Sequence, residues 1–165
     1  LPLIKKGDRY DKTITPIVSA KINPMKNQNI NQEDRMIDYN NLFSINRIGC
    51  DEVLEGGFSL SLGNEYKILD KLNSDNEIFS FNLGNSLRVD ENPDLPTNSS
   101  LGKKTSNFVG QINLKPSKFI NLNYDFITEN NLTDLNYHKV KSEFKINNFV
   151  TSFEFIEENN IIGDE

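Results

Sequence analysis

Phe119-Ile120-Asn121-Leu122-Asn123-Tyr124-Asp125-Phe126-Ile127-Thr128 is the stretch of sequence that decides the fold class of this chain. Its even-numbered residues from 120 to 126 are apolar, and each residue between them is Asn or Asp. Strict alternation with a period of two is typical of a β-strand with one apolar face and one wet face. No stretch of the sequence shows a comparable apolar stripe with the helical period of about 3.6 residues, so we predict an all-β protein.

The same alternation recurs on both sides of this stretch. We predict seven strands, over residues 13–22, 54–69, 77–90, 106–115, 118–129, 136–146 and 149–158. Pro16 interrupts the first of them. Because proline cannot donate a hydrogen bond to the ladder, that strand is expected to be strained, bulged or locally at an edge. Gly56, Gly57 and Gly63 precede no predicted helix, so they are expected to mark bulges or close backbone contacts and not a phosphate site.

The connections between the predicted strands are alternately long and short. Asn147-Asn148 and Pro116-Ser117 are two-residue turns, and Asn tolerates the left-handed backbone that such turns need. The segments 23–53, 91–105 and 130–135 are longer and rich in Asn and Asp. Short turns on one rim and long loops on the other are typical of an outer-membrane β-barrel. We therefore favour an antiparallel, up-and-down transmembrane β-barrel segment, in which the seven strands form part of a larger barrel.

A soluble β-sandwich has the same alternation, with its apolar face turned inward instead of outward. The alternation alone does not separate the two folds, and the long–short rhythm of the connections favours the barrel. The aromatic residues argue the other way, because the chain has no Trp and only 5 Tyr where a barrel normally carries aromatic girdles. A different outer-membrane channel or receptor barrel and a secreted sandwich that binds a ligand therefore stay open as alternatives.

Composition narrows the classes of function. The formal net charge is −6, whereas a nucleic-acid-binding protein usually presents a basic face, so no nucleic-acid partner is predicted. A mean hydropathy of −0.55 fits a soluble protein and a barrel alike, since only alternate strand residues of a barrel meet lipid. The chain starts at Leu1 without a signal peptide and holds one cysteine, Cys50, so we expect a fragment of a longer protein without an internal disulfide.

The sequence offers no catalytic constellation, and we predict neither an enzyme nor a cofactor or metal site. His138, the only histidine, has no recognisable nucleophile or orienting carboxylate beside it and is expected to be solvated at a loop edge, where a predicted strand begins. Carboxylates gather in the loops, where they solubilise the surface or, as the alternative, bind hard divalent cations. Lys139, Lys141 and Lys145 share the polar side of one predicted strand. They either balance glutamates across the hairpin, which we favour, or meet anionic groups in a wet lumen.

One stretch is more specific than any of these patterns. It starts at Asp38-Tyr39-Asn40-Asn41-Leu42-Phe43 and continues through Asn46-Arg47 and Gly49-Cys50-Asp51-Glu52 to Glu55-Gly56-Gly57. It is followed by Leu62-Gly63-Asn64-Glu65-Tyr66, Leu95-Pro96-Thr97-Asn98-Ser99-Ser100-Leu101 and Ser106-Asn107-Phe108-Val109-Gly110. In order and spacing these segments resemble the LptD family of lipopolysaccharide-assembly outer-membrane proteins, and the resemblance covers roughly residues 14–158.

The positions that carry the resemblance are Asp38, Tyr39, Asn41, Leu42, Phe43, Asn46, Arg47, Gly49, Asp51, Gly56, Gly57, Gly63, Tyr66, Leu95, Pro96, Ser100 and Gly110. The chain departs from the family at two places. It has Asp51-Glu52 where the family commonly has Asp-Arg, and Cys50 does not occupy the family's usual cysteine positions. No disulfide is therefore carried over from the family.

The resemblance implies transport without catalysis. It implies a wall segment of a barrel in the outer membrane of a Gram-negative bacterium, which places lipopolysaccharide in the outer leaflet with a lipoprotein plug of the LptE type. Residues 1–165 would be a partial barrel domain. The closing strands and an N-terminal periplasmic domain, through which a periplasmic bridge delivers lipopolysaccharide, would lie outside it. The 23–53 loop carries most of the motif, so we expect it to fold inward or to pack on neighbouring loops.

In such a barrel each strand turns alternate residues to membrane lipid and to the lumen. The residues expected to face lipid are Phe79, Phe81, Leu83, Ile120, Leu122, Tyr124, Phe126, Phe144, Phe153 and Phe155. The residues expected to face the lumen are Asn121, Asn123, Lys139, Lys141 and Lys145.

Overall fold

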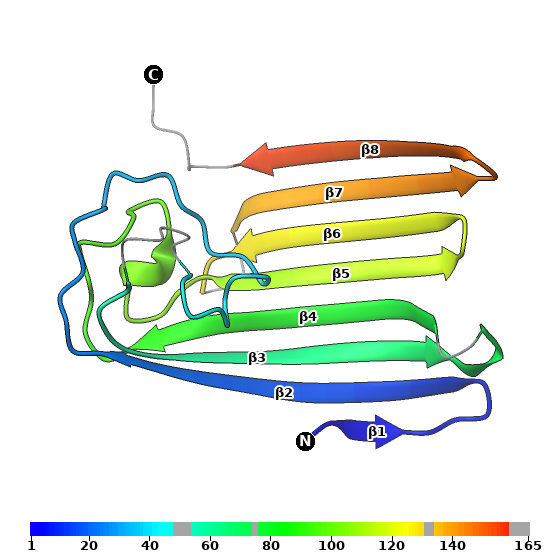
Figure 1. The fold of residues 1–165 in the computed structure, drawn as a ribbon, viewed down its shortest axis with the longest axis horizontal. Helices are drawn as coiled ribbons and strands as arrows, with labels where there is room; N and C mark the ends of the chain where they lie inside the picture. The colour runs from blue at the N-terminus through cyan, green and yellow to red at the C-terminus, as the bar shows by residue number, and fades with distance from the viewer. Residues whose placement is uncertain (48–53, 74–75, 131–133, 159–165) are drawn as a thin grey trace.

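The structure is a computed structural model that describes residues 1–47, 54–73, 76–130 and 134–158. Its strands form one antiparallel sheet in which neighbours in sequence are neighbours in space (Figure 1). They are β1 (Leu3–Lys5), β2 (Tyr10–Asn23), β3 (Gly57–Asp70), β4 (Asn76–Arg88), β5 (Phe108–Ser117), β6 (Ile120–Thr128), β7 (Leu135–Ile146) and β8 (Phe149–Glu158). Two short 3₁₀ helices, η1 (Lys71–Asn73) and η2 (Ser100–Gly102), lie in the connections. Within the described ranges, no helix has the length and apolar character needed to span a membrane.

The tight connections all lie at one end of the sheet and the long connections at the other (Figure 1). At the first end, here called the turn end, two residues join β5 to β6 and two join β7 to β8. At the second, the loop end, long segments join β2 to β3 and β4 to β5. The sheet is open in this chain, with β1 and β8 at its two edges. The predicted up-and-down order and the long–short rhythm are confirmed.

All seven predicted strands are present, with ends that differ by a few residues. β3 begins at Gly57 and not at residue 54, and β4 ends at Arg88 and not at residue 90. The short strand β1 is an addition that the sequence does not predict, because three residues carry too little alternation to be recognised.

The turn between β5 and β6 corrects the sequence prediction. The sequence predicts it at Pro116-Ser117, whereas the structure places it at Lys118-Phe119. Pro116 stays inside β5, where the ladder to β6 is irregular between Leu114 and Ser117. An irregular strand end is a position that a residue without an N–H donor can occupy at little cost.

Two backbone expectations are met. Pro16 lies in β2 opposite Asn64, and β1 pairs with β2 only as far as Ile14, so the other side of Pro16 is a local edge. In the β7–β8 turn, Asn147 has a φ of 54°, and it is the one non-glycine residue of the described ranges with a positive φ. The side chain that tolerates the left-handed region therefore stands where the turn needs it.

The register places the apolar residues of neighbouring strands on one face of the sheet. Tyr124 lies opposite Ile112 of β5 and Val140 of β7, and directly opposed residues share a face. The apolar face carries Ile14, Val18, Ile22, Phe79, Phe81, Leu83, Leu114, Ile120, Leu122, Tyr124, Phe126, Val140, Phe144, Phe153 and Phe155. The polar face carries Ser59, Ser61, Ser80, Asn82, Ser86, Asn113, Asn121, Asn123, Lys139, Lys141 and Lys145.

The burial of the two faces is the reverse of that in a soluble sandwich. On the polar face Ser80 and Ser86 are each 1% exposed, whereas on the apolar face Val18 is 66% and Phe153 is 63% exposed. β8 is exposed along its whole length. A sandwich would bury the phenylalanine rows against a second sheet. The structure instead covers the serine rows of β3 and β4, which fits a sheet whose apolar side meets an apolar medium.

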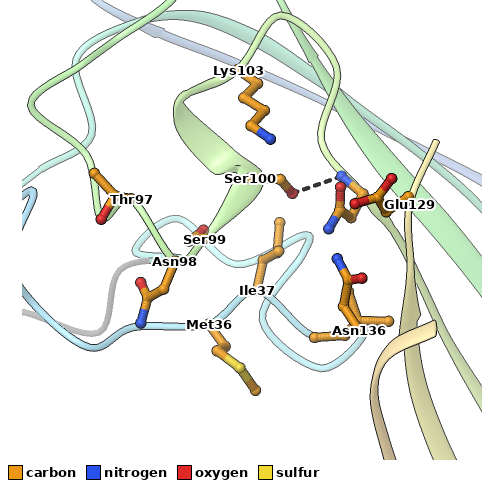
Figure 2. A pocket seen from close by; sticks show the side chains of 11 residues that line it. Met36, Ile37, Thr97, Asn98, Ser99, Ser100, Lys103, Glu129 and Asn136 are labelled. Atoms are coloured by element: carbon orange, nitrogen blue, oxygen red, sulfur yellow. Dashed lines mark hydrogen bonds between the residues drawn. The ribbon is translucent and has the colours of Figure 1, made fainter. Parts of the chain in front are cut away.

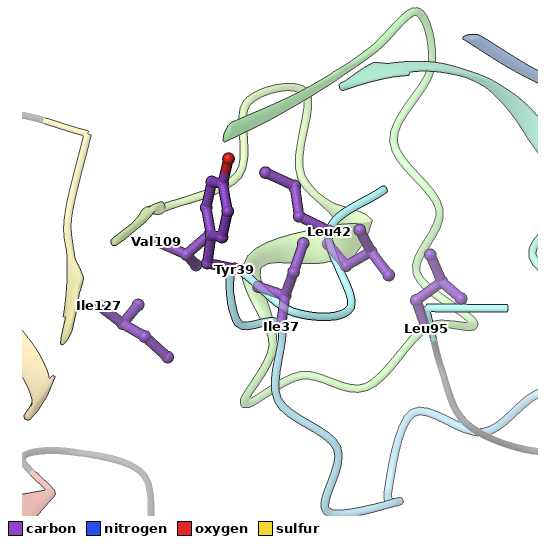
Figure 3. Close-up of a cluster of buried hydrophobic side chains, with 7 residues drawn as sticks. Ile37, Tyr39, Leu42, Leu95, Val109 and Ile127 are labelled. Atoms are coloured by element: carbon purple, nitrogen blue, oxygen red, sulfur yellow. The ribbon is translucent and has the colours of Figure 1, made fainter. Parts of the chain in front are cut away.

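The apolar core is small and lies at the loop end, on the polar side of the sheet (Figure 3). Its members are Ile37, Tyr39, Leu42, Leu95, Leu101, Val109 and Ile127. Val109 of β5 and Ile127 of β6 are opposite each other, and the other five come from the long connections. The core therefore fastens the loops onto the polar face and joins no second sheet.

The β7–β8 turn gives a test of the backbone assignment. Asn147→Val should lower the free energy of unfolding by about 1–2 kcal/mol, because a β-branched residue is disfavoured in the left-handed region. Asn147→Gly should be neutral or stabilising. Urea unfolding of both variants measures the difference, and an equal effect of the two substitutions would contradict the left-handed conformation.

Candidate functional site

The connection between β2 and β3 folds over the polar face at the loop end. Its described parts, residues 24–47 and 54–56, are called the covering segment here. This segment arches from the end of β2 towards β5 (Figure 1). It packs on the β4–β5 loop, since Ile30 N–H donates to Asp94 O (2.8 Å) and Thr97 N–H donates to Asn31 O (3.1 Å). The expectation that this loop packs on neighbouring loops is confirmed.

A tight turn in the covering segment explains the start of the family motif. The Asp38 carboxylate accepts a hydrogen bond from Asn41 N–H (2.8 Å), and the Asn41 side-chain oxygen accepts one from Asp38 N–H (3.0 Å). Leu42 N–H then donates to Asp38 O (3.0 Å). Asp and Asn are the residues whose short side chains close such turns on their own backbone. The turn fixes the direction of the next two residues, Leu42 and Phe43.

Leu42 and Phe43 fill a hollow that two glycines leave in the sheet. Gly63 of β3 and Gly84 of β4 lie opposite each other, on the polar face. A Cβ atom on Gly84 would stand 2.5 Å from Leu42 Cδ2, and one on Gly63 would stand 2.4 Å from Phe43 Cζ. The sheet has room for the two side chains only because both strands carry glycine here. This is the close backbone contact that the sequence predicts for Gly63.

Tyr39 packs against one side of this contact. Its ring packs edge-on against Phe43, with ring centroids 5.7 Å apart, and its hydroxyl lies 3.5 Å from a carboxylate oxygen of Glu65. Burial, reinforced by the negative charge of Glu65, raises the pKa of Tyr39 above its ordinary value. Tyr39 therefore stays a neutral hydrogen-bond donor.

Arg47, the last residue of the first described part of the covering segment, lies in a socket of hydroxyl groups. Its side chain is fully buried. The Nη1 group donates to Ser61 Oγ (3.0 Å) and Ser86 Oγ (2.6 Å), and Nη2 donates to Ser59 Oγ (2.8 Å). Nε donates to Glu55 Oε2 (2.9 Å), and Nη2 also pairs with the second oxygen of that carboxylate. The planar guanidinium thus uses its fixed fork of donors on four acceptor groups.

Glu55 joins Arg47 to the sheet through a second arginine. Its carboxylate also pairs with Arg88 at the end of β4, and Arg88 donates to the backbone oxygen of Gly56. Lys21 of β2 completes the group, with Nζ 3.8 Å from Glu55 Oε2 and donating to Ile45 O (2.8 Å). Strands β2 and β4 and both described parts of the covering segment therefore meet at one buried carboxylate.

The geometry of this cluster explains the glycines of the motif. Gly57 has a φ of +90°, and a Cβ there would stand 2.9 Å from Arg88 Nη2. A Cβ on Gly56 would stand 2.5 Å from the backbone oxygen of Met25. The Arg47–Glu55–Arg88 cluster is not predicted as a site, since one sequence does not show which charges meet. The sequence feature that could have indicated this cluster is the row of small Ser residues in β3 and β4. Gly49, Cys50 and Asp51 lie outside the described residues.

The predicted lysine row lies on the polar face, away from the covering segment. Lys139 Nζ is 3.1 Å from Glu154 across the β7–β8 hairpin, so the favoured charge balance is confirmed for this lysine. Lys145 Nζ is 2.8 Å from Glu143, which lies on the same strand. Lys141 lies opposite Asn123. Amide side chains continue the row across β6 and β5, where Asn123 Nδ2 donates to Asn113 Oδ1 (2.7 Å).

His138 differs from its prediction. Its side chain is only 21% exposed, and its Nε2 lies 3.1 Å from a carboxylate oxygen of Glu157 on β8. Its ring stands between those of Tyr124 (6.3 Å) and Phe155 (6.0 Å) on the apolar face. The sequence does not show the carboxylate because it is 19 positions away and is brought near by the β7–β8 register (157 minus 138). Among the described residues, no three His, Cys, Asp or Glu side chains lie close enough to hold a metal ion.

A small cavity of about 180 Å³ lies between the covering segment, η2 and the loop ends of β6 and β7 (Figure 2). Met36, Ile37 and Ile127 supply its apolar lining, and hydroxyl, amide and charged groups supply the remainder. Ser100 Oγ there accepts a hydrogen bond from Asn107 N–H (2.6 Å), which ties η2 to the start of β5. The matched positions Leu95 and Ser100 are thus buried parts of the loop packing.

The sequence model of the LptD family, described as LPS transport system D, matches residues 2–161. That range contains the covering segment and all strands of the sheet. A comparison with curated proteins finds no match.

The Glu55 cluster gives a test of how the covering segment is held. Glu55→Gln should lower the free energy of unfolding by about 3–5 kcal/mol, because it leaves the buried guanidinium groups of Arg47 and Arg88 without a negative partner. Glu33→Gln removes one charge from the exposed part of the same segment and is the matched control. Urea unfolding and the rate of protease cleavage at residues 24–47 report the two effects. Equal behaviour of the two variants would contradict the role of Glu55.

Proposed function

The chain belongs to the LptD family of lipopolysaccharide transport proteins, and we propose that it forms part of the barrel wall through which lipopolysaccharide is inserted into the outer leaflet. Lipopolysaccharide transport at the outer membrane of Gram-negative bacteria is the role of this family, which is a transport family and not an enzyme family. The finer assignment, insertion into the outer leaflet, is the proposal.

The reversed burial of the sheet is the observation that carries the proposal. Rows such as Phe79, Leu114 and Leu122 lie on the apolar face, where acyl chains would replace water. The opposite rows carry amides, hydroxyls and lysines, which suit a water-filled interior. A sheet with open edges cannot persist in hydrocarbon, because its edge N–H and C=O groups would lack partners. We therefore place residues 1–165 in a larger closed barrel, to which other strands of the same protein contribute.

In this barrel the covering segment narrows the lumen at the loop end. It occupies the polar face of β3 and β4 and reaches Val109 and Ile127 at the loop ends of β5 and β6. The polar rows around Asn113, Asn123 and Lys141 stay open beside it. The saccharide of lipopolysaccharide would pass along the uncovered amide and lysine rows. The same surface would offer contacts to a lipoprotein plug of the LptE type. Delivery from a periplasmic bridge through an N-terminal domain completes the proposed path.

A pair of substitutions tests the lipid-facing assignment. Leu122→Arg should destabilise the folded barrel in lipid vesicles by about 2–4 kcal/mol, because it places a charge near the bilayer midplane. Asn123→Arg, one residue along the same strand, should be mild, since it faces water. Urea titration in vesicles, together with heat-modifiable migration on a denaturing gel, measures both. Equal tolerance at the two sites would contradict the assigned orientation.

Depletion of the full-length protein tests the transport role itself. Cells in which its synthesis is shut off should lose newly made lipopolysaccharide from their surface, because the wall that passes it outward is missing. Surface labelling of lipopolysaccharide after the shut-off, with labelling of an unrelated outer-membrane barrel as the control, measures this. Unchanged surface lipopolysaccharide would contradict the proposed function.

A further inference from the structure

A cleft of about 970 Å³ opens at the turn end of the sheet, between β4 and β5. The ladder between these strands ends where Phe79 lies opposite Leu114. Beyond that pair, residues 76–78 and 115–117 are still extended but do not pair with each other. Pro116 lacks the N–H that would continue the ladder, so the two strand ends separate here. The cleft is therefore built into the strand register.

The wall of this cleft is continuous with the apolar face of the sheet. Phe79 and Leu114 line it and belong to the apolar rows, and Ile78 and Phe119 line it as well. Leu114 is 38% and Phe119 is 49% exposed, so the apolar wall is open to its surroundings. An acyl chain lying on the apolar face would reach the cleft without crossing a polar barrier.

Cations stand at the mouth of the cleft. Its charged lining consists of Arg9, Asp70, Glu77, Lys115 and Lys118. Asp70 lies 3.6 Å from Arg9. The carboxylate of Glu77 lies 3.8 Å from a lysine of β3. In the described part of the chain no carboxylate forms an ion pair with Lys115 or Lys118, and the Lys118 ammonium lies 5.2 Å from the Phe119 ring centroid.

The charge at the turn end contrasts with that of the whole protein. The chain has a net charge of −6, yet cationic side chains collect at this end, at Lys5, Lys6, Arg9, Lys12, Lys71, Lys115 and Lys118. Carboxylates there are largely occupied, since Asp11 is 3.0 Å from Lys71 and Asp70 is held by Arg9. A negatively charged group approaching the cleft would therefore meet ammonium groups that are free to bind it.

We propose that this cleft binds an anionic glycerophospholipid. The phosphate lies between Lys115 and Lys118, and an acyl chain runs over Leu114 and Phe79 onto the apolar face. The combination of an apolar wall and two exposed cations favours a lipid over a free phosphate ion. A phosphate ion would leave the apolar wall in contact with water. The proposal rests on the proposed placement in a membrane, in which the turn end lies at the periplasmic leaflet.

Lipid retention by the full-length protein tests this site. The protein is reconstituted in bilayers of phosphatidylcholine with a minor share of phosphatidylglycerol, and the lipids that stay bound are quantified by native mass spectrometry. The wild type should retain phosphatidylglycerol in preference to phosphatidylcholine. The double variant K115Q/K118Q should lose this preference, by about fivefold for each lysine removed. K103Q/K104Q removes two lysines from the β4–β5 loop at the loop end and should retain the preference.

Each outcome decides the proposal. Unchanged retention in K115Q/K118Q, or an equal loss in K103Q/K104Q, would overturn it. If inorganic phosphate alone displaces the lipid, the two lysines bind a free anion and not a lipid headgroup. This result would overturn the proposal too. Heat-modifiable migration of each variant confirms that the barrel has assembled. Failure of the wild type to enter vesicles would contradict the proposed function instead, so the two failures are distinguishable.

Discussion

A β-sheet that exposes phenylalanine rows and buries serine rows is unfavourable in water. Each Å² of apolar surface left in water forgoes roughly 25 cal/mol, and the apolar face of this sheet carries such side chains from β2 to β8. The same face becomes favourable when its surroundings are themselves apolar. This one requirement orients every strand, because the period of two then sends each Asn, Ser and Lys of the alternating rows to the other side. The loops follow, since they pack only where the sheet is polar.

The covering segment solves the problem that this orientation creates at the loop end. A polar face offers little hydrophobic free energy to hold a loop, so the segment is held by two specific devices. Leu42 and Phe43 enter the hollow over Gly63 and Gly84. The Arg47 guanidinium enters a socket of three serine hydroxyls and the Glu55 carboxylate. Burying an arginine costs free energy unless every donor has an acceptor. Other positions of the segment would leave the Arg47 donors without acceptors, so the contact fixes the position of the segment more than it adds to stability.

The sequence predicts the strands well and the site poorly, for physical reasons. Alternation with a period of two follows directly from the pleat, so the run from Ile120 to Phe126 identifies its strand without help from the remainder of the chain. Alternation says nothing about which face is covered, and the burial of Ser80 and Ser86 settles that. The turn after β5 is misplaced because proline is common in turns and is also tolerated at irregular strand ends. The Glu55 cluster escapes prediction because its members come together only through the register of β2, β3 and β4.

The two ends of the sheet differ in what they can hold, and the difference follows from the same alternation. At the loop end the polar rows of β3 and β4 are covered by the chain itself, and the buried charges Arg47, Glu55 and Arg88 are paired with one another. At the turn end the β4–β5 ladder stops at Phe79 and Leu114, and the strand ends part. There the apolar face and exposed ammonium groups become neighbours, which happens nowhere in the interior of a regular sheet, where the two faces are separated by the backbone. In the proposed barrel an amphiphile therefore meets its complementary surface at a rim. Between the two rims, one face of the sheet is polar and the other is apolar. A saccharide can therefore pass along the polar face while acyl chains contact the apolar face.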